Sequence, residues 1–206
     1  MENTEDRLRV IKRRFRLFMN GEVSRSLREK GMDYHIIWGV SLQHMKMIAA
    51  ECGKDFELAI ALWQENVREC RILATLVMPQ SQMDAALAAS WGNDLKTMEE
   101  AELCAFNLFR KLPFAFDMSL HWLSDGDELQ RICSYNILCR LLPGISSCKK
   151  DAVDVIAKAL DVDVVSEKSG LRHTAFNCLN RFMLVDAKCK ERGDEIIGGI
   201  EQRLRL

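Results

Sequence analysis

Apolar residues recur along this chain at the three- and four-residue spacing of an α-helix. Between residues 68 and 78, Cys70, Leu73, Ala74 and Val77 fall on one helical face. The same spacing returns in three later segments, at Ala101, Cys104, Ala105 and Leu108, at Ile132, Tyr135, Cys139 and Leu142, and at Ala175, Cys178, Leu179 and Met183. Strand signals are weak, because runs of β-branched residues are few. The pattern therefore predicts an all-α protein.

Tryptophans and prolines mark the ends of the expected helices. Each of three apolar stretches closes on a tryptophan, and the helical segment that follows it stops at a proline; these residues are Trp63, Trp91 and Trp122, and Pro79, Pro113 and Pro143. Proline suits a position just past a helix end, because it has no N–H and disfavours helical geometry in its predecessor. Leu160 takes the tryptophan's place in the next segment.

The spacing of these marks is regular. The prolines are 34 and 30 residues apart and the tryptophans 28 and 31. A pair of helices repeating every roughly 30 to 40 residues is typical of an α-solenoid of HEAT-like helical repeats. The alternative is an irregular bundle whose helices end at these places by coincidence. In the solenoid the tryptophans are core wedges between repeats; as ligand platforms they would instead be exposed.

The length of 206 residues fits a single HEAT-like repeat domain spanning residues 1–206. Within it, residues 1–31 form basic N-terminal helices, and residues 184–206 depart from the pattern, as expected of a C-terminal capping segment. No apolar run approaches the ~18 residues that span a bilayer. The charged start, MENTEDRLRV, lacks the apolar stretch of a secretory signal, which favours a cytoplasmic location.

Eight cysteines occur singly, with no Cys-x-x-Cys and no Cys/His cluster at zinc spacing. We interpret them as small buried apolar residues in a reducing compartment, with a metal or redox role as the alternative. No metal and no cofactor is expected. His121, beside Trp122, is expected to be a packed histidine, since no spacing supports nucleophilic catalysis.

Charge is balanced overall but uneven along the chain. The net charge is −1, whereas residues 7 to 30 contain nine Lys/Arg and two Glu. In this segment an apolar stripe of Leu8, Ile11, Phe15 and Phe18 lies beside a basic stripe of Arg9, Lys12, Arg13 and Arg16. The basic stripe is either the solvated face of a packed helix or an electrostatic footprint for an anionic polymer such as DNA.

Residues 34–79, YHIIWGVSLQHMKMIAAECGKDFELAIALWQENVRECRILATLVMP, resemble the first half of the AlkD-like DNA alkylation repair family. The residues that carry the resemblance are Gly39, Val40, Leu62, Trp63, Glu69, Arg71, Leu73 and Ala74. The segments CAFNLFRKLPFAFD and ELQRICSYNILCRLL extend it over roughly residues 34 to 183. The resemblance implies HEAT-like repeats wrapped around duplex DNA, and a glycosylase that removes cationic N-alkylated purines without a metal.

Family enzymes place an aromatic-x-x-x-Asp pair on the helix before this Asn-Leu-Phe sequence, and another Trp on a later helix. The resemblance puts Glu102 at the Asp position, Met98 at the first aromatic position and Cys178 at the later Trp. Glu102 is thus the candidate catalytic carboxylate, which would stabilise the developing cation and place a water. The alternative is a glutamate on a solvated helix face. Both aromatic partners, which would attract the cationic base, are replaced.

Two further arginines are candidate contacts to DNA. Arg71 could reach a phosphate, or could belong with Glu69 to a structural motif at a helix start, and Arg131 lies near a family position that contacts the DNA backbone. Two functions follow from the sequence. One is a DNA-binding repair protein that recognises duplex DNA through its backbone; the other is a non-catalytic helical-repeat adaptor that binds a protein partner.

Overall fold

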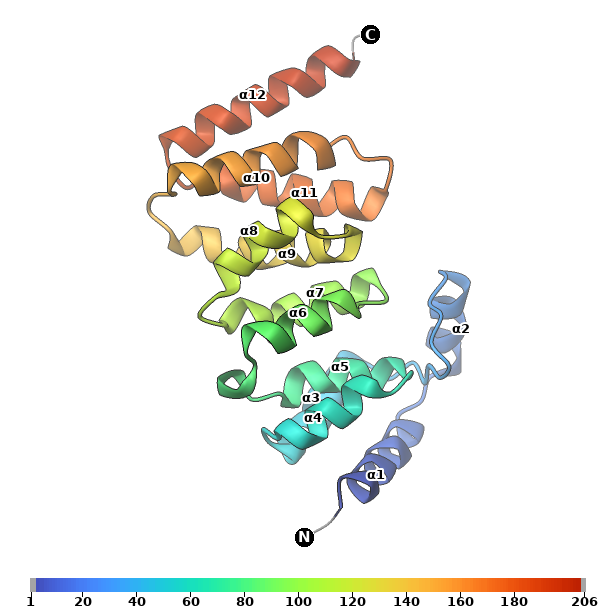
Figure 1. Ribbon diagram of the computed structural model, residues 1–206. Coiled ribbons are helices and arrows are strands. Elements are labelled where there is room, and N and C mark those ends of the chain that lie inside the picture. The colour runs from blue at the N-terminus through green and yellow to red at the C-terminus, as the bar shows by residue number, and fades with distance from the viewer. Residues whose placement is uncertain (1–2, 205–206) are drawn as a thin grey trace. The chain divides into compact units, whose positions relative to one another are not determined.

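The computed structural model describes residues 3–204, which contain twelve α-helices and three short 3-10 turns (Figure 1). No strand occurs among these residues; only an isolated bridge joins Ile36 to Val67. Residues 1–2 and 205–206, the ends of the expected N-terminal and capping segments, lie outside the described residues. The all-α prediction is confirmed.

The chain divides between Asp84 and Ala85 into two compact units, called here the N-terminal and C-terminal units. The N-terminal unit contains α1 (Thr4–Leu17), α2 (Gly21–Glu29), α3 (Leu42–Cys52), α4 (Phe56–Gln64), α5 (Arg68–Val77) and the turn η1 (Gln80–Gln82). The C-terminal unit contains α6 (Ala85–Asn93), α7 (Met98–Asn107), η2 (Phe109–Lys111), α8 (Ala115–Asp125), α9 (Glu128–Leu141), η3 (Leu142–Gly144), α10 (Lys150–Asp163), α11 (Ser169–Phe182) and α12 (Ala187–Leu204). A single continuous domain, and the role of residues 184–206 as its cap, stay predictions.

The helix ends follow the tryptophans and prolines. Helix α4 ends directly after Trp63 and α5 ends just before Pro79, while α10 ends soon after Leu160. Helix α7 stops earlier than expected, at Asn107, and the turn η2 covers most of the distance to Pro113. The predicted helix pairs are confirmed.

In the C-terminal unit the helices form two layers. Helix α9 packs against α7 on one side and α11 on the other, so these three form one row, whereas α8 packs against α9 and α10 from the second layer (Figure 1). Trp122 lies between the layers: its ring meets Phe109 edge-on at 5.7 Å, and a Cβ added to Gly92 would lie 2.4 Å from it. Trp63, Trp91 and Trp122 are all buried, which confirms their role as core wedges.

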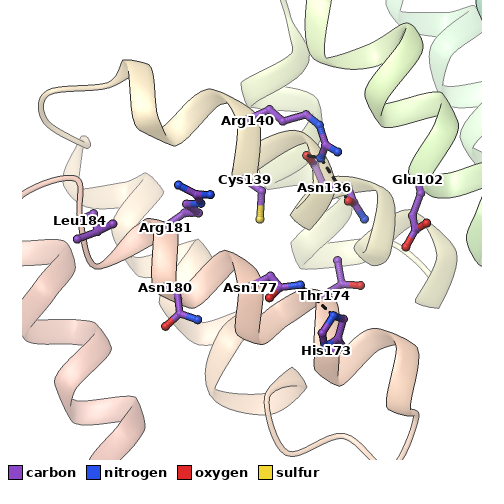
Figure 2. A pocket seen from close by; sticks show the side chains of 10 residues that line it. All are labelled: Glu102, Asn136, Cys139, Arg140, His173, Thr174, Asn177, Asn180, Arg181 and Leu184. Atoms are coloured by element: carbon purple, nitrogen blue, oxygen red, sulfur yellow. Dashed lines mark hydrogen bonds between the residues drawn. The ribbon is translucent and has the colours of Figure 1, made fainter.

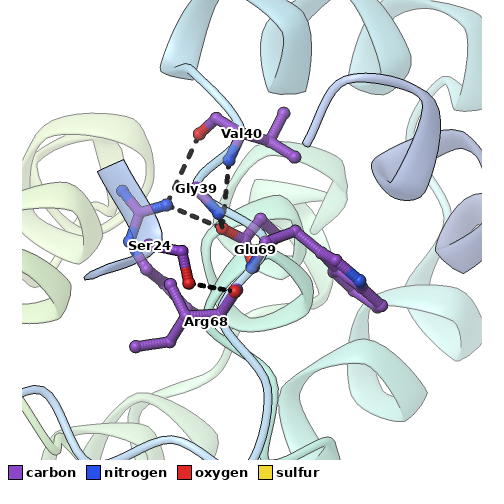
Figure 3. Close-up of polar contacts among 7 residues, drawn as sticks. Ser24, Gly39, Val40, Arg68 and Glu69 are labelled. Carbon is purple, nitrogen blue, oxygen red and sulfur yellow. Dashed lines mark hydrogen bonds and ion pairs between the residues drawn. The ribbon is translucent and has the colours of Figure 1, made fainter. Parts of the chain in front are cut away.

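In the N-terminal unit a buried carboxylate organises the start of α5 (Figure 3). Glu69 is fully buried and accepts hydrogen bonds from the backbone N–H groups of Trp38, Gly39 and Val40 at 3.1, 2.9 and 3.3 Å. Arg68 donates to the same carboxylate at 2.9 Å. Gly39 has a φ of 74°, and a Cβ there would lie 2.4 Å from a backbone oxygen, so this bend requires glycine. The Gly-Val and Glu positions of the family resemblance thus hold one loop onto α5.

Helix α1 lies against the rest of the N-terminal unit through a buried apolar stripe and flanking ion pairs. Ile11 and Phe15 are buried, and Arg7 and Arg14 pair with Asp55 and Glu51. Part of the basic N-terminal segment is therefore engaged inside its own unit.

Six of the eight cysteines are buried, as expected, while Cys52 and Cys139 are partly exposed. The expectation for His121 is wrong. Its side chain is 71% exposed and lies 3.4 Å from Asp125, because it occupies the outward face of α8 one position before the buried Trp122. Among the helices described, none has the length and apolar character to cross a bilayer.

Candidate functional site

The row of α7, α9 and α11 carries an open pocket of about 670 Å³ that contains Glu102 (Figure 2). Its lining residues are mostly polar: Glu102 from α7, Asn136, Cys139 and Arg140 from α9, His173, Thr174, Asn177, Asn180 and Arg181 from α11, and Leu184 beyond its end. We call it the Glu102 pocket. No tryptophan, tyrosine or phenylalanine is among the residues that line it.

Helix periodicity explains why these side chains meet. Asn136 and Arg140 are four residues apart on α9, as are Asn177 and Arg181 on α11, so each pair shares a helix face. Both asparagine–arginine pairs line the pocket (Figure 2). Packing of α9 between α7 and α11 brings both faces beside Glu102.

Glu102 is held on α7 by a well-defined helix start. The Thr97 hydroxyl accepts a hydrogen bond from the Glu100 N–H at 3.1 Å, and the Glu100 carboxylate accepts one from the Lys96 N–H at 2.9 Å. These contacts cap the first turn of the helix. They place Glu102, one turn further on, at the pocket wall.

The Glu102 carboxylate is partly desolvated, and cationic or potentially cationic side chains lie near it. Burial is the main reason that its pKa is raised, with a further contribution from Glu99, while Arg140 and His173 act in the opposite direction. Within the described part of the chain, the Glu102 side chain makes no hydrogen bond or ion pair. It is therefore available to hold a cationic group or to orient a water molecule.

Arginines surround the pocket and its rim. The Arg140 guanidinium donates to the Asn136 carbonyl oxygen at 2.7 Å and lies 5.1 Å from the centroid of the Phe106 ring. The Arg110 guanidinium lies 5.0 Å from the same centroid. Phe106 is 38% exposed, one helical turn beyond Glu102. Arg181 is exposed and has no ion-pair partner among the described residues. We call Arg110, Arg140 and Arg181 the arginine face.

Sequence reasoning missed the arginine face, although a signal for it exists. The segments AFNLFR, SYNILCR and AFNCLNR, which begin at Ala105, Ser134 and Ala175, repeat an aromatic-Asn followed by Arg. Aligning α9 and α11 on this motif would have placed Arg140 and Arg181 on equivalent faces, since each follows its asparagine by four residues, whereas Arg110 follows Asn107 by three and lies in η2.

Neither of the two positions at which family enzymes carry aromatics is among the residues that line the pocket. Met98 lies at the start of α7, where its Sδ would be 2.7 Å from a Cβ at Gly170 of α11. Cys178 is fully buried beneath the pocket. An aromatic cage around the bound base is therefore not formed by these two residues.

The four cations predicted on the N-terminal stripe all lie on α1, and the structure divides them. Lys12 is 2.6 Å from Glu65, and Arg9 pairs with a carboxylate of its own helix at 3.4 Å. Arg13 and Arg16 are exposed, and the described residues offer neither an ion-pair partner. Of these four cations, Arg13 and Arg16 alone present an uncompensated charge to solvent.

Arg71 and Arg131 both make internal contacts. The Arg71 guanidinium stacks 4.0 Å from the Trp63 ring, donates to the Trp63 carbonyl at 3.0 Å and is 2% exposed. Arg131 lies 2.7 Å from Asp163, to which the Tyr135 hydroxyl also donates at 2.6 Å. Neither arginine lines the Glu102 pocket; Arg131 lines a separate hollow beside α8 and α10.

Comparison with known proteins places this chain. The sequence model described as DNA alkylation repair enzyme matches residues 12–161, well over half of the chain. The chain belongs to the DNA alkylation repair enzyme family. No curated protein matches it by sequence. Groups of His, Cys, Asp or Glu able to hold a metal are absent from the residues that the structure describes.

A solved structure supports the same fold. It is described as "A new family of proteins related to the HEAT-like repeat DNA glycosylases with affinity for branched DNA structures". The likeness has a TM-score of 0.74 at 17% identity and covers 91% of this chain and 80% of that chain. At this identity the likeness shows a shared HEAT-like fold.

Proposed function

We propose that this member of the DNA alkylation repair enzyme family binds duplex DNA through the arginine face of its C-terminal unit. The observation that carries the proposal is the grouping of Arg140 and Arg181 with polar side chains around one open pocket. Family membership and the affinity of the structural neighbour for branched DNA support it.

The chemistry of the arginine face suits a phosphate backbone. Guanidinium groups donate paired hydrogen bonds to phosphate oxygens, and asparagine amides such as Asn177 and Asn180 can add neutral ones. We expect these arginines to contact the phosphate backbone, where most hydrogen bonds between proteins and DNA are made. Binding would therefore depend on charge and DNA shape more than on sequence.

The N-terminal unit would add a second set of cations. Arg13 and Arg16 are the exposed, uncompensated members, whereas Arg9 and Lys12 must first release carboxylates. Arg71 and Arg131 would also have to leave internal contacts to reach a phosphate. We therefore assign these four a smaller part in binding, although each was a candidate from sequence.

Salt dependence tests the proposal. If the arginine face neutralises three phosphates, affinity for a duplex should fall roughly 40-fold between about 50 and 200 mM salt. Arg140→Ala and Arg181→Ala should each lower the slope of log affinity against log salt by about 0.9. Arg192→Ala is the matched control, since Arg192 pairs with Glu195 on α12, away from the pocket. The assay is fluorescence anisotropy with linear and branched duplexes.

An affinity that does not change with salt, or an Arg192→Ala effect equal to that of Arg140→Ala, would rule out the arginine face as the binding surface. Absence of any DNA binding would leave the adaptor function, with a protein partner, as the alternative. A cytoplasmic location and independence of any metal or cofactor stay predictions.

A second candidate activity is excision of cationic N-alkylated purines with Glu102 as the catalytic carboxylate. The unpaired Glu102 carboxylate in an open pocket favours it. Alkylation makes the purine a positively charged leaving group, so a nearby carboxylate can stabilise the developing charge and position the attacking water. With Met98 and Cys178 in place of aromatic residues, we expect slow excision.

Release of 3-methyladenine and 7-methylguanine from alkylated duplex measures this activity. Glu102→Gln should lower the rate about 100-fold, while Glu191→Gln, the same change on exposed α12, should leave it unchanged. Because the pKa of Glu102 is raised, activity should decline on acidification at a higher pH than an ordinary glutamate would give. Release that persists in Glu102→Gln would remove Glu102 from the mechanism.

A further inference from the structure

A leucine projects into solvent at the edge of the Glu102 pocket. Leu184 lies in the turn after α11, lines the pocket together with Arg181, and is 79% exposed (Figure 2). Every other lining residue except Cys139 carries a polar or charged side chain. The apolar surface of Leu184 is in contact with water, so burial of this surface against a ligand would favour binding.

The turn that carries Leu184 is fixed at both ends by backbone hydrogen bonds. The Leu184 N–H donates to the Arg181 carbonyl oxygen at 3.2 Å. Two residues further on, the Asp186 carboxylate accepts the N–H groups of Cys148 and Cys189, both at 2.9 Å. Because none of these contacts uses the leucine side chain, the turn presents that side chain in a fixed place, and its replacement should leave the fold intact.

The neighbours of Leu184 indicate which ligand suits it. Arg181 is exposed and has no ion-pair partner among the described residues, Asn180 is exposed beside it, and Arg140 lines the same pocket. A ligand that covers this surface should therefore combine negative charge with an apolar surface. Stacked bases framed by phosphate groups have this combination. An apolar protein surface would instead leave two guanidinium groups buried without hydrogen-bond partners.

We propose that Leu184 is a wedge that inserts where the base stacking of duplex DNA is interrupted, so that the protein binds a nicked or branched duplex more tightly than a continuous one. The inference rests on the proposed function, because the arginine face must first hold the phosphate backbone. It adds the residue that distinguishes one DNA structure from another.

Two opposing free energies explain this preference. Separation of a stacked base step costs about as much free energy as burial of one leucine side chain gains, so insertion into a continuous duplex adds little affinity. At a nick or a branch point the stacking is already weakened, which removes most of the cost and leaves the gain. Replacement of Leu184 by alanine removes the burial of roughly two methylene groups, which corresponds to about tenfold in affinity.

The test compares a continuous duplex with the same duplex carrying a central nick, using the full-length protein and fluorescence anisotropy. Leu184→Ala should weaken binding to the nicked duplex about tenfold and change binding to the continuous duplex by less than about twofold. Leu184→Met keeps the apolar bulk and should retain most of the affinity, whereas Leu184→Asn, which is polar and of similar length, should behave like the alanine variant. Val162→Ala is the matched control, since Val162 is 58% exposed on α10 and does not line the Glu102 pocket.

A second measurement follows the bases directly. The fluorescence of 2-aminopurine rises when the base loses its stacking neighbours, so a 2-aminopurine beside the nick should brighten when the wild-type protein binds. At a saturating concentration of Leu184→Ala the signal should stay near that of free DNA.

The outcomes separate this inference from the proposed function. Equal weakening of both duplexes by Leu184→Ala, no weakening of either, or an effect of Val162→Ala as large as that of Leu184→Ala would overturn the role of Leu184 and leave DNA binding by the arginine face in place. A protein that binds neither duplex in a salt-dependent manner would overturn both.

Discussion

Replacement of Glu69 by alanine should unfold the N-terminal unit locally while sparing the C-terminal unit. The fully buried carboxylate accepts three backbone N–H groups and the Arg68 guanidinium, which is only 6% exposed. Alanine supplies no acceptor. The variant therefore leaves two buried N–H donors, one partly buried N–H donor and a buried cation without their main partner.

The size of the effect follows from the loss of this one carboxylate. A buried donor without an acceptor costs about 1–3 kcal/mol, and removal of one member of a buried ion pair costs about 3–5 kcal/mol. These contributions overlap, because the same two oxygens make every contact, so we take about 4 kcal/mol for the whole change. That is a large part of the ~5–15 kcal/mol that stabilises a typical domain.

Hydrogen exchange resolves the two units separately, which a single melting curve does not. A loss of about 4 kcal/mol corresponds to roughly thousandfold faster exchange of the protected amides in α4 and α5. Amides of α9 should be unaffected. Glu57 is an exposed glutamate in the same unit, and Glu57→Ala should change the free energy of opening measured by exchange by less than about 1 kcal/mol. An equal effect in α5 and α9, or a change in α5 no larger than that of Glu57→Ala, would refute the reasoning.

Three further substitutions address the C-terminal unit. Gly92→Ala would place a Cβ 2.4 Å from the Trp122 ring and should lower the free energy of unfolding by about 1–3 kcal/mol. Gly198 has open space around it, so Gly198→Ala should raise the free energy of unfolding by about 0.5–1 kcal/mol. Chemical denaturation measures both changes, and a Gly92→Ala variant as stable as the wild type would contradict the packing of Trp122. Asp186 accepts backbone hydrogen bonds from Cys189 and Cys148, which lower its pKa to about 2. The pKa of this carboxyl in the unfolded chain is about 3.9, so the ionised Asp186 stabilises the fold above that pH, and the stabilisation is lost as the pH falls toward 2. The melting temperatures of the wild type and of Asp186→Asn should therefore converge on acidification. A difference between them that stays constant with pH would count against this role.

Much of the fold could be predicted from the sequence, because apolar spacing and helix-ending residues are local signals. Apolar spacing determines which face of a helix is buried, and all four apolar positions predicted on α5, and all four on the segment from Ala101 to Leu108, are buried. Trp63 and Pro79 predicted where α4 and α5 end, and Leu160 predicted the end of α10, since helix termination depends on neighbouring residues. The resemblance added Glu102, and the structure places it in a pocket.

The sequence by itself thus determined an all-α repeat protein and the helix faces that form its core. Only the tertiary structure decided what each polar face meets: Lys12 and Arg71 lie against partners of their own unit, while Arg140 and Arg181 are left around the pocket. The physical reason is that periodicity fixes a residue's direction from its own helix axis, whereas contact depends on the register and distance of a neighbouring helix, set by packing over the whole unit.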